Sequence, residues 1–162
     1  MDTSTLKPAH VRRIKSLALL SDSQLEAFLK CVEFVSYQHS TNIFKEGQRG
    51  DSMFLILEGE VRVFSKQKNG EILFLRVLQA GDALGEIALL TEAPRSASAE
   101  AIKESLLLKI SAASLQKLMS VEPALAAQFL YHLARTLGRN LSDVTARLRR
   151  QKEFGDTFSF IQ

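Results

Sequence analysis

The amino-acid sequence predicts a mainly β domain that is flanked by helices. Between residues 34 and 78 it contains several short runs rich in β-branched and aromatic residues, and turn-forming residues separate these runs. Apolar residues recur at helical spacing on both sides of this region. Short strands that repeat about every ten residues favour a compact antiparallel barrel or sandwich.

The segment before the first strand is predicted to be helical. One helix is expected from about Ala9, and residues 1–14 are interpreted as an N-terminal extension. Ser21 followed by Gln24 three residues later is the pattern of a capping box, which satisfies backbone N–H groups at a helix start. The apolar residues that follow at helical spacing are Leu25, Phe28, Leu29 and Val32.

Six strands are predicted from residue composition and the turns between them. They are residues 34–37, 42–44, 53–57, 61–64, 72–78 and 106–110. The pair Asn69-Gly70 lies between two of these runs and is the strongest hairpin signal in the chain, typical of a type I′ turn.

Two helices are predicted after the last strand. Ser111 is the expected N-cap of the first, which ends near Met119, and Pro123 suits the first position of the second, which extends to about Lys152. The apolar residues of the second helix follow a near-heptad spacing and are Leu130, Leu133, Leu137, Leu141, Val144 and Leu148. This stripe either packs on the helix's own barrel or forms the seam of a parallel homodimer, and we favour the dimer.

The long helix has two further features. Gly138 lies inside the stripe, where it either admits a close neighbour or marks a hinge. Residues 153–162 form a tail with three phenylalanines, which we expect to pack on the domain or to dock on a partner.

Composition excludes several classes of function. The formal charge of +3 is too small to indicate nucleic-acid binding. The single cysteine, Cys31, can form neither an intramolecular disulfide nor a cysteine-based metal site, and it is predicted to be a buried thiol. No apolar run approaches the roughly 18 residues of a membrane span. We expect a cytoplasmic protein without a metal or other cofactor.

The stretch from Gly85 to Ala99 has the parts of an anion site. Gly85 permits a sharp turn or a close approach, and residues 86–90 suit a short helix whose N-terminus faces that turn. Arg95 adds a planar guanidinium that matches two oxygens of a phosphate. The small residues after it leave room for a ligand beside the main chain.

This stretch resembles a known motif. Leu84-Gly85-Glu86-Ile87-Ala88-Leu89, followed by Pro94-Arg95-Ser96-Ala97-Ser98-Ala99, is similar to the phosphate-binding cassette of the cyclic nucleotide-binding domain family, and departs from it at Leu84 and Ala99. This is the family of the catabolite activator protein and the protein kinase A regulatory subunits. A second pattern of the family is matched by Ile43, Gly47, Gly50, Asp51, Met53, Phe54, Ile56 and Gly59.

The resemblance covers residues 15–145 and implies a fold. It is an eight-stranded antiparallel β-roll, jelly-roll-like, with N-terminal helices and a C-terminal helix pair. On this basis the cyclic nucleotide-binding domain is assigned to residues 15–152, including the long helix.

The resemblance also implies a role for each site residue. Glu86 would accept a hydrogen bond from the ribose 2′-hydroxyl, so a 2′-deoxy analogue should bind poorly. Arg95 would pair with the phosphate. Backbone N–H groups or close approach are expected from Gly85, Ile87, Ala88 and Ala97.

The base is less defined than the phosphate and ribose. Ser96 does not decide between cyclic AMP and cyclic GMP, and we favour cyclic AMP. Strand alternation suggests an apolar wall from Val63, Leu73 and Leu75, and similarity to the family places Arg139 and Asn140 of the long helix above the base.

We therefore expect a cyclic nucleotide receptor or regulatory domain, not an enzyme, because no nucleophile has a positioned base. Ligand binding would reposition the C-terminal helices and signal to an unknown downstream protein. The alternatives are a cyclic GMP-binding domain, or a regulatory module excised from a transcription factor, kinase regulator or channel. The chain lacks the further length that a DNA-binding domain would need, so none is expected within it.

Overall fold

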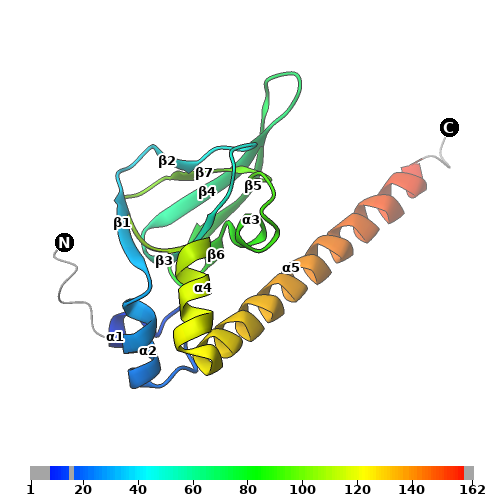
Figure 1. The fold of residues 1–162 in the computed structure, drawn as a ribbon. Helices are drawn as coiled ribbons and strands as arrows, with labels where there is room; N and C mark the ends of the chain where they lie inside the picture. The colour runs from blue at the N-terminus through cyan, green and yellow to red at the C-terminus, as the bar shows by residue number, and fades with distance from the viewer. Residues whose placement is uncertain (1–7, 15–16, 159–162) are drawn as a thin grey trace.

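The computed structural model describes residues 8–14 and 17–158 of the chain and shows a β-rich body with helices at both ends (Figure 1). The strands are β1 (Glu33–Tyr37), β2 (Thr41–Phe44), β3 (Ser52–Glu58), β4 (Glu60–Lys66), β5 (Ile72–Gln79), β6 (Ala83–Leu84), β7 (Ser98–Ala101) and β8 (Ser105–Ser111). The helices are α1 (Pro8–Val11), α2 (Asp22–Leu29), α3 (Glu86–Thr91), α4 (Ala112–Val121) and α5 (Pro123–Phe158).

The strands form two four-stranded antiparallel sheets, in the orders β1-β8-β3-β6 and β2-β7-β4-β5. An apolar cluster drawn from both sheets fills the roll. It contains Phe54, Ile56, Val61, Leu78, Leu84, Ala99 and Leu107. The predicted β-roll is confirmed, and each of the six predicted strands lies within an observed one.

Sequence reasoning missed the two strands that flank the predicted anion site. β6 has only two residues, and β7 consists of serine, alanine and glutamate, which have little intrinsic preference for strands. β7 forms because it pairs with β2 on one side and β4 on the other. Ladder hydrogen bonds to both neighbours therefore outweigh its weak propensity.

The hairpin between β4 and β5 is confirmed, but its predicted type I′ turn is wrong. A type I′ turn needs positive φ at both central residues, and here only Gly70 has it, with φ 87°. The Gly70 N–H donates to the Gln67 carbonyl, and the Gln67 N–H donates to the Glu71 carbonyl. Asn69 stays at negative φ, and its side-chain oxygen accepts from the Glu71 N–H at 3.0 Å. This arrangement is a three-residue loop that ends in a left-handed glycine.

The N-terminal helices share a second apolar core with α4 and α5. Val11 and Ile14 are fully buried in it, so the segment before residue 15 contributes to the domain. The rings of Phe28 in α2 and Phe129 in α5 lie 5.3 Å apart. Cys31 was predicted to be buried, but it is only half-buried and packs at the edge of this core.

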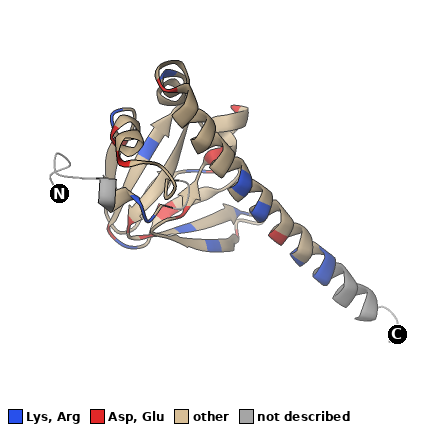
Figure 2. Cartoon of the chain, turned by 90° about the horizontal axis from the view of Figure 1, so that it is seen from below, with Lys and Arg blue, Asp and Glu red and all other residues tan. Residues whose placement is uncertain are grey.

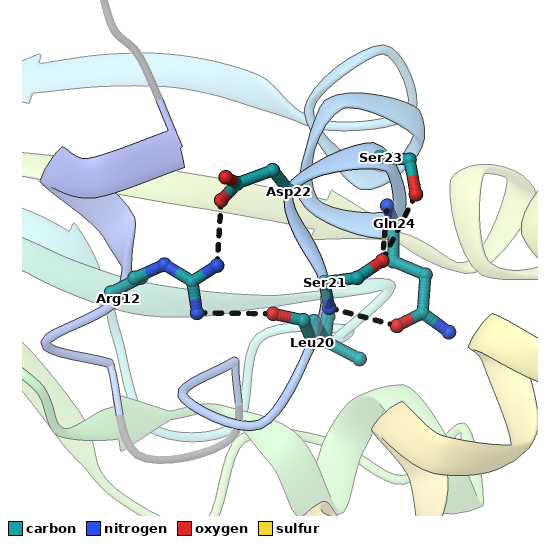
Figure 3. A network of polar contacts seen from close by, with 6 residues as sticks. All are labelled: Arg12, Leu20, Ser21, Asp22, Ser23 and Gln24. Carbon is teal, nitrogen blue, oxygen red and sulfur yellow. Dashed lines mark hydrogen bonds and ion pairs between the residues drawn. The ribbon is translucent and has the colours of Figure 1, made fainter.

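The start of α2 is held by the predicted capping box (Figure 3). The Gln24 N–H donates to the Ser21 hydroxyl at 3.2 Å, and the Ser21 N–H donates to the Gln24 side-chain oxygen at 2.9 Å. Arg12 adds a charged contact to Asp22 at 2.6 Å and donates to the Leu20 carbonyl. These bonds fix α2 against the chain that precedes it. Ser111 is likewise confirmed as the N-cap of α4, because it accepts from the Ser114 N–H.

The long helix α5 begins at Pro123, as predicted, and runs away from the body (Figure 1). Its 36 residues correspond to about 54 Å. It ends at Phe158 and not near Lys152, and the expected contacts of the tail lie outside the side chains that the structure describes. Within residues 8–14 and 17–158, none of the helices has the length and apolar character to cross a membrane.

The apolar stripe of α5 divides into two halves. Leu133 is buried, and Leu130 and Leu137 pack against the second core. The outer positions, Leu141, Val144 and Leu148, are 68%, 52% and 60% exposed. Arginines are spaced along the same outer half (Figure 2). The inner half is therefore a core helix, and the outer half is a polar helix with an uncovered apolar stripe.

Candidate ligand-binding site

A cavity of about 80 Å³ lies where β6 meets α3, and the chain that leads to β7 forms part of its wall. Its walls come from the predicted anion site and from the strands β2, β4, β5 and β6. They are Phe44, Val63, Arg76, Leu84, Gly85, Glu86, Ile87, Ala88, Arg95, Ser96 and Ala97. The structure thus brings together every predicted residue of the 85–97 stretch, together with Val63.

Arg95 is the central charge of this cavity, and only 5% of it is exposed. Its Nη1 donates to the Gly85 carbonyl at 3.1 Å, and its Nη2 donates to the Ser52 hydroxyl at 3.2 Å. Its Nε has no hydrogen-bond partner within the described structure. Burial lowers the pKa of Arg95, and the charges of Asp51 and Tyr37 act in the opposite direction.

The backbone of Arg95 is fixed by the loop between β2 and β3. The Arg95 N–H donates to the Gln48 carbonyl at 2.8 Å, and its carbonyl accepts from the Gly47 N–H at 2.9 Å. Gly50 lies against the guanidinium, and a Cβ there would collide with Ala88. The second glycine-rich pattern in the sequence thus has a physical role, because Gly50 lets this loop lie against Arg95.

Gly85 turns the chain from β6 into α3 in the left-handed conformation, with φ 78°. The turn leaves the first residue of the helix, Glu86, facing the cavity. A Cβ at residue 85 would collide with the Arg95 guanidinium. Both the backbone conformation and the close approach therefore require glycine here.

Glu86 is the buried carboxylate of the site, with 5% of its surface exposed. Burial raises the pKa of the Glu86 carboxyl, while its own backbone N–H and the charge of Arg76 lower it. A buried carboxylate needs a hydrogen-bond donor, and a ligand hydroxyl is one group that meets this need. The cavity thus presents a cation and an acceptor to one ligand.

A second cavity, of about 380 Å³, lies between the β5–β6 turn and α5. Both residues predicted to cover the base, Arg139 and Asn140, line it. Arg76 of β5 lines this cavity and the smaller one, so the two adjoin. A ligand that extends past Arg76 would reach the helix.

Leu73 and Leu75, also predicted to face the base, line neither cavity, and they are 46% and 42% exposed. Arg76 pairs with Val63 in the same register that pairs the buried Leu78 with Val61, so Arg76 and Leu78 share one face of β5. Leu75 follows on the opposite face. The register of β4 and β5 shifts beyond this point, where Phe64 pairs with Phe74.

Sequence reasoning missed Arg76, Phe44 and Leu84 as cavity residues. Phe44 ends β2, far along the chain from Arg95, and no local pattern connects the two. Arg76 stands out in the sequence only as a charge within an otherwise apolar strand. This isolated charge is the one feature of the sequence that could have identified Arg76 as a cavity residue.

Comparison with known proteins agrees with this geometry. The model of the cyclic nucleotide-binding domain matches residues 34–122, more than half of the chain. The chain therefore belongs to the cyclic nucleotide-binding domain family.

Among its relatives is the CRP-like cAMP-activated global transcriptional regulator of Mycobacterium tuberculosis, 28% identical over 75% of this chain and 56% of that protein. The cGMP-dependent protein kinase of Toxoplasma gondii is 38% identical over 57% of this chain and 9% of its own length. The crystal structure of the Thermus thermophilus catabolite activator protein is 27% identical, with a TM-score of 0.75, over 83% of this chain and 62% of that one. The chain thus spans only part of each relative.

We expect Gly85→Ala to destabilise the protein more than Gly70→Ala does. Both glycines have left-handed backbones, so alanine costs roughly 1–2 kcal/mol at either position. A Cβ at residue 70 meets no atom within 4 Å, whereas one at residue 85 meets Arg95. Thermal unfolding of the two variants measures the difference. Equal losses of stability in the two variants would show that Arg95 can move aside for a Cβ at residue 85 without cost.

Proposed function

We propose that this domain is a receptor for a 3′,5′-cyclic nucleotide, with cyclic AMP as the first candidate. The observation that carries the proposal is the buried Arg95 guanidinium, which has no carboxylate of the described residues within ion-pairing distance. A buried cation is costly unless an anion pairs with it. The phosphate of a cyclic nucleotide supplies one negative charge, and its ribose 2′-hydroxyl suits Glu86.

Both cavities support a ligand of this shape. The phosphate and ribose would occupy the smaller cavity, and the base would extend past Arg76 toward α5. Asn140 lines the larger cavity, and an asparagine amide pairs with the N6 and N7 edge of adenine. We therefore place cyclic AMP first and regard the domain as a binder that leaves its ligand unchanged.

Cyclic GMP is the second candidate because of Arg76. An arginine fork matches the O6 and N7 acceptors of guanine, and Arg76 lies between the two cavities. The relatives include both a cAMP-activated regulator and a cGMP-dependent kinase. Calorimetric titration with each nucleotide decides between them, and binding of neither would overturn the proposal.

Arg95→Ala should weaken cyclic nucleotide binding by at least about tenfold. A hydrogen bond to a charged group contributes about 1.5–3 kcal/mol, which corresponds to a factor of ten or more. Arg62→Ala is the matched control, because Arg62 pairs with Glu100 at 3.0 Å and lines neither cavity. Titration of both variants with the preferred nucleotide tests this. Affinity of the Arg95 variant equal to that of the wild type would contradict the assignment of the phosphate.

Glu86→Gln should stabilise the ligand-free protein at pH 7 and weaken its binding of ligand. The folded state raises the pKa of Glu86, so it holds that proton more tightly than the unfolded chain does. Its contribution is therefore favourable only at low pH, and it is lost as the pH rises through both pKa values. A neutral amide avoids this loss but accepts the 2′-hydroxyl less strongly.

Unfolding temperatures measured across pH test the Glu86 prediction. The gain from Glu86→Gln should shrink as the pH falls toward the pKa of a free glutamate. Glu104→Gln, at an exposed carboxylate, should show no such trend. A Glu86 variant less stable than the wild type at pH 7 would mean that another group compensates the buried charge.

We further propose that α5 transmits the signal, and that its outer half pairs with a second copy of the chain. The inner leucines pack on the domain, which supports the first of the two interpretations of the stripe for that half. The outer residues Leu141, Val144 and Leu148 have no cover within the described structure. Their near-heptad spacing is that of a coiled-coil seam.

Leu141→Glu combined with Leu148→Glu should convert a dimer into a monomer. Each charge would enter the proposed seam, where desolvation opposes it. Tyr131→Glu is the control, since Tyr131 is 61% exposed on the same helix but lies off the stripe. Sedimentation of the three proteins measures their mass. A wild-type protein that is monomeric at high concentration would refute the dimer.

A further inference from the structure

The Arg95 guanidinium donates its hydrogen bonds to two neutral groups and lies near two phenylalanine rings. The guanidinium carbon lies 4.3 Å from the centroid of the Phe44 ring and 6.0 Å from that of Phe54. A cation within about 6 Å of a ring face is attracted by the negative face of the π-system. Phe44 is therefore in the stronger position of the two.

The fold holds Phe44 in that position. The register between β2 and β7 shifts between Asn42 and Phe44, which pair with the adjacent residues Glu100 and Ala99. Such a bulge redirects the side chain that follows it. The Phe44 ring also stacks on the buried Phe54 ring, with centroids 6.0 Å apart and planes 30° apart. The ring is thus held both by its strand and by its stacking on Phe54.

An aromatic support differs from a carboxylate in one respect that matters for a ligand. A carboxylate would neutralise the guanidinium and occupy the N–H groups that an anion needs. A ring face lowers the cost of burying the cation while leaving its charge and its N–H edges available. Only the Gly85 carbonyl and the Ser52 hydroxyl accept hydrogen bonds from the Arg95 guanidinium in the described structure.

We propose that Phe44 is the positioning residue for Arg95, holding the guanidinium by its face so that its edge can receive the ligand's phosphate. This inference rests on the proposed function. It predicts that affinity for the anion depends on the electron density of the Phe44 ring. Phe44 also lines the cavity, so a direct contact between ring and ligand is the competing explanation.

Fluorinated phenylalanines at position 44 separate the two explanations, because they keep the shape of the ring but draw electron density from its face. If the ring supports the cation, successive fluorines weaken cyclic nucleotide binding stepwise. If the ring face touches the phosphate, fluorines strengthen binding. The same analogues at Phe28, which packs on Phe129 away from the cavity, should leave affinity unchanged.

Natural substitutions complete the test. Phe44→Leu should weaken binding of the preferred nucleotide about 3- to 30-fold, whereas Phe44→Tyr, which keeps a ring, should retain most of the affinity. In an Arg95→Gln background, Phe44→Leu should have no further effect, because the partner of the ring is gone. Unfolding curves verify that each variant is folded.

A measurement without ligand tests the geometry itself. The Arg95 Nε–H proton resonance should move when the Phe44 ring current is removed in Phe44→Leu, and it should stay in place in Phe28→Leu. An unmoved resonance, or undiminished nucleotide affinity in Phe44→Leu, would overturn the inference and leave the proposed function standing. A wild-type protein that binds neither nucleotide would overturn both.

Discussion

The burial of the Arg95 guanidinium without a facing carboxylate is the constraint on which the site depends. A buried cation without a paired anion depends on neutral groups that accept its hydrogen bonds or contact its face, because these partly replace its lost solvation. Here the partners are the Gly85 carbonyl, the Ser52 hydroxyl and the rings of Phe44 and Phe54. They come from β2, β3 and the turn after β6. No single segment contains them all, so the closed roll is required before the charge can be buried.

The glycines of the site follow from the same constraint. A Cβ at residue 85 would collide with the Arg95 guanidinium, and a Cβ at residue 50 would collide with Ala88 and crowd the Arg95 side chain. The loop that carries Gly47 and Gly50 also forms two backbone hydrogen bonds with Arg95, one donated by the Gly47 N–H and one accepted by the Gln48 carbonyl. The two sequence patterns, which begin at Ile43 and Leu84, are therefore one structural unit. One pattern supplies the charge, and the other holds its backbone in place.

The sequence was sufficient for features determined locally. The capping box at Ser21, the six longer strands and the contiguous residues of the cassette were predicted, since each depends on neighbouring residues. Features that depend on pairing between distant strands were not predictable. β7 exists because of its neighbours, and the pairing of β5 with β4 puts Arg76 opposite Val63 at the cavity while Leu73 and Leu75 lie outside it. Alternation along one strand does not say which of its two faces the rest of the fold will cover.

The arrangement of the two cavities limits how a ligand can influence the rest of the chain. A ligand can shift a conformational equilibrium only through contacts that differ between the states. One that filled both cavities would touch the cassette and, beyond Arg76, residues Arg139 and Asn140 of α5. The inner half of α5 is packed against α2 through Phe28 and Phe129, so the helix cannot move there without disturbing a packed core. Any movement of α5 that such contacts favoured would therefore require a discrete repacking of α5 against the N-terminal helices, or would be confined to its uncovered outer half.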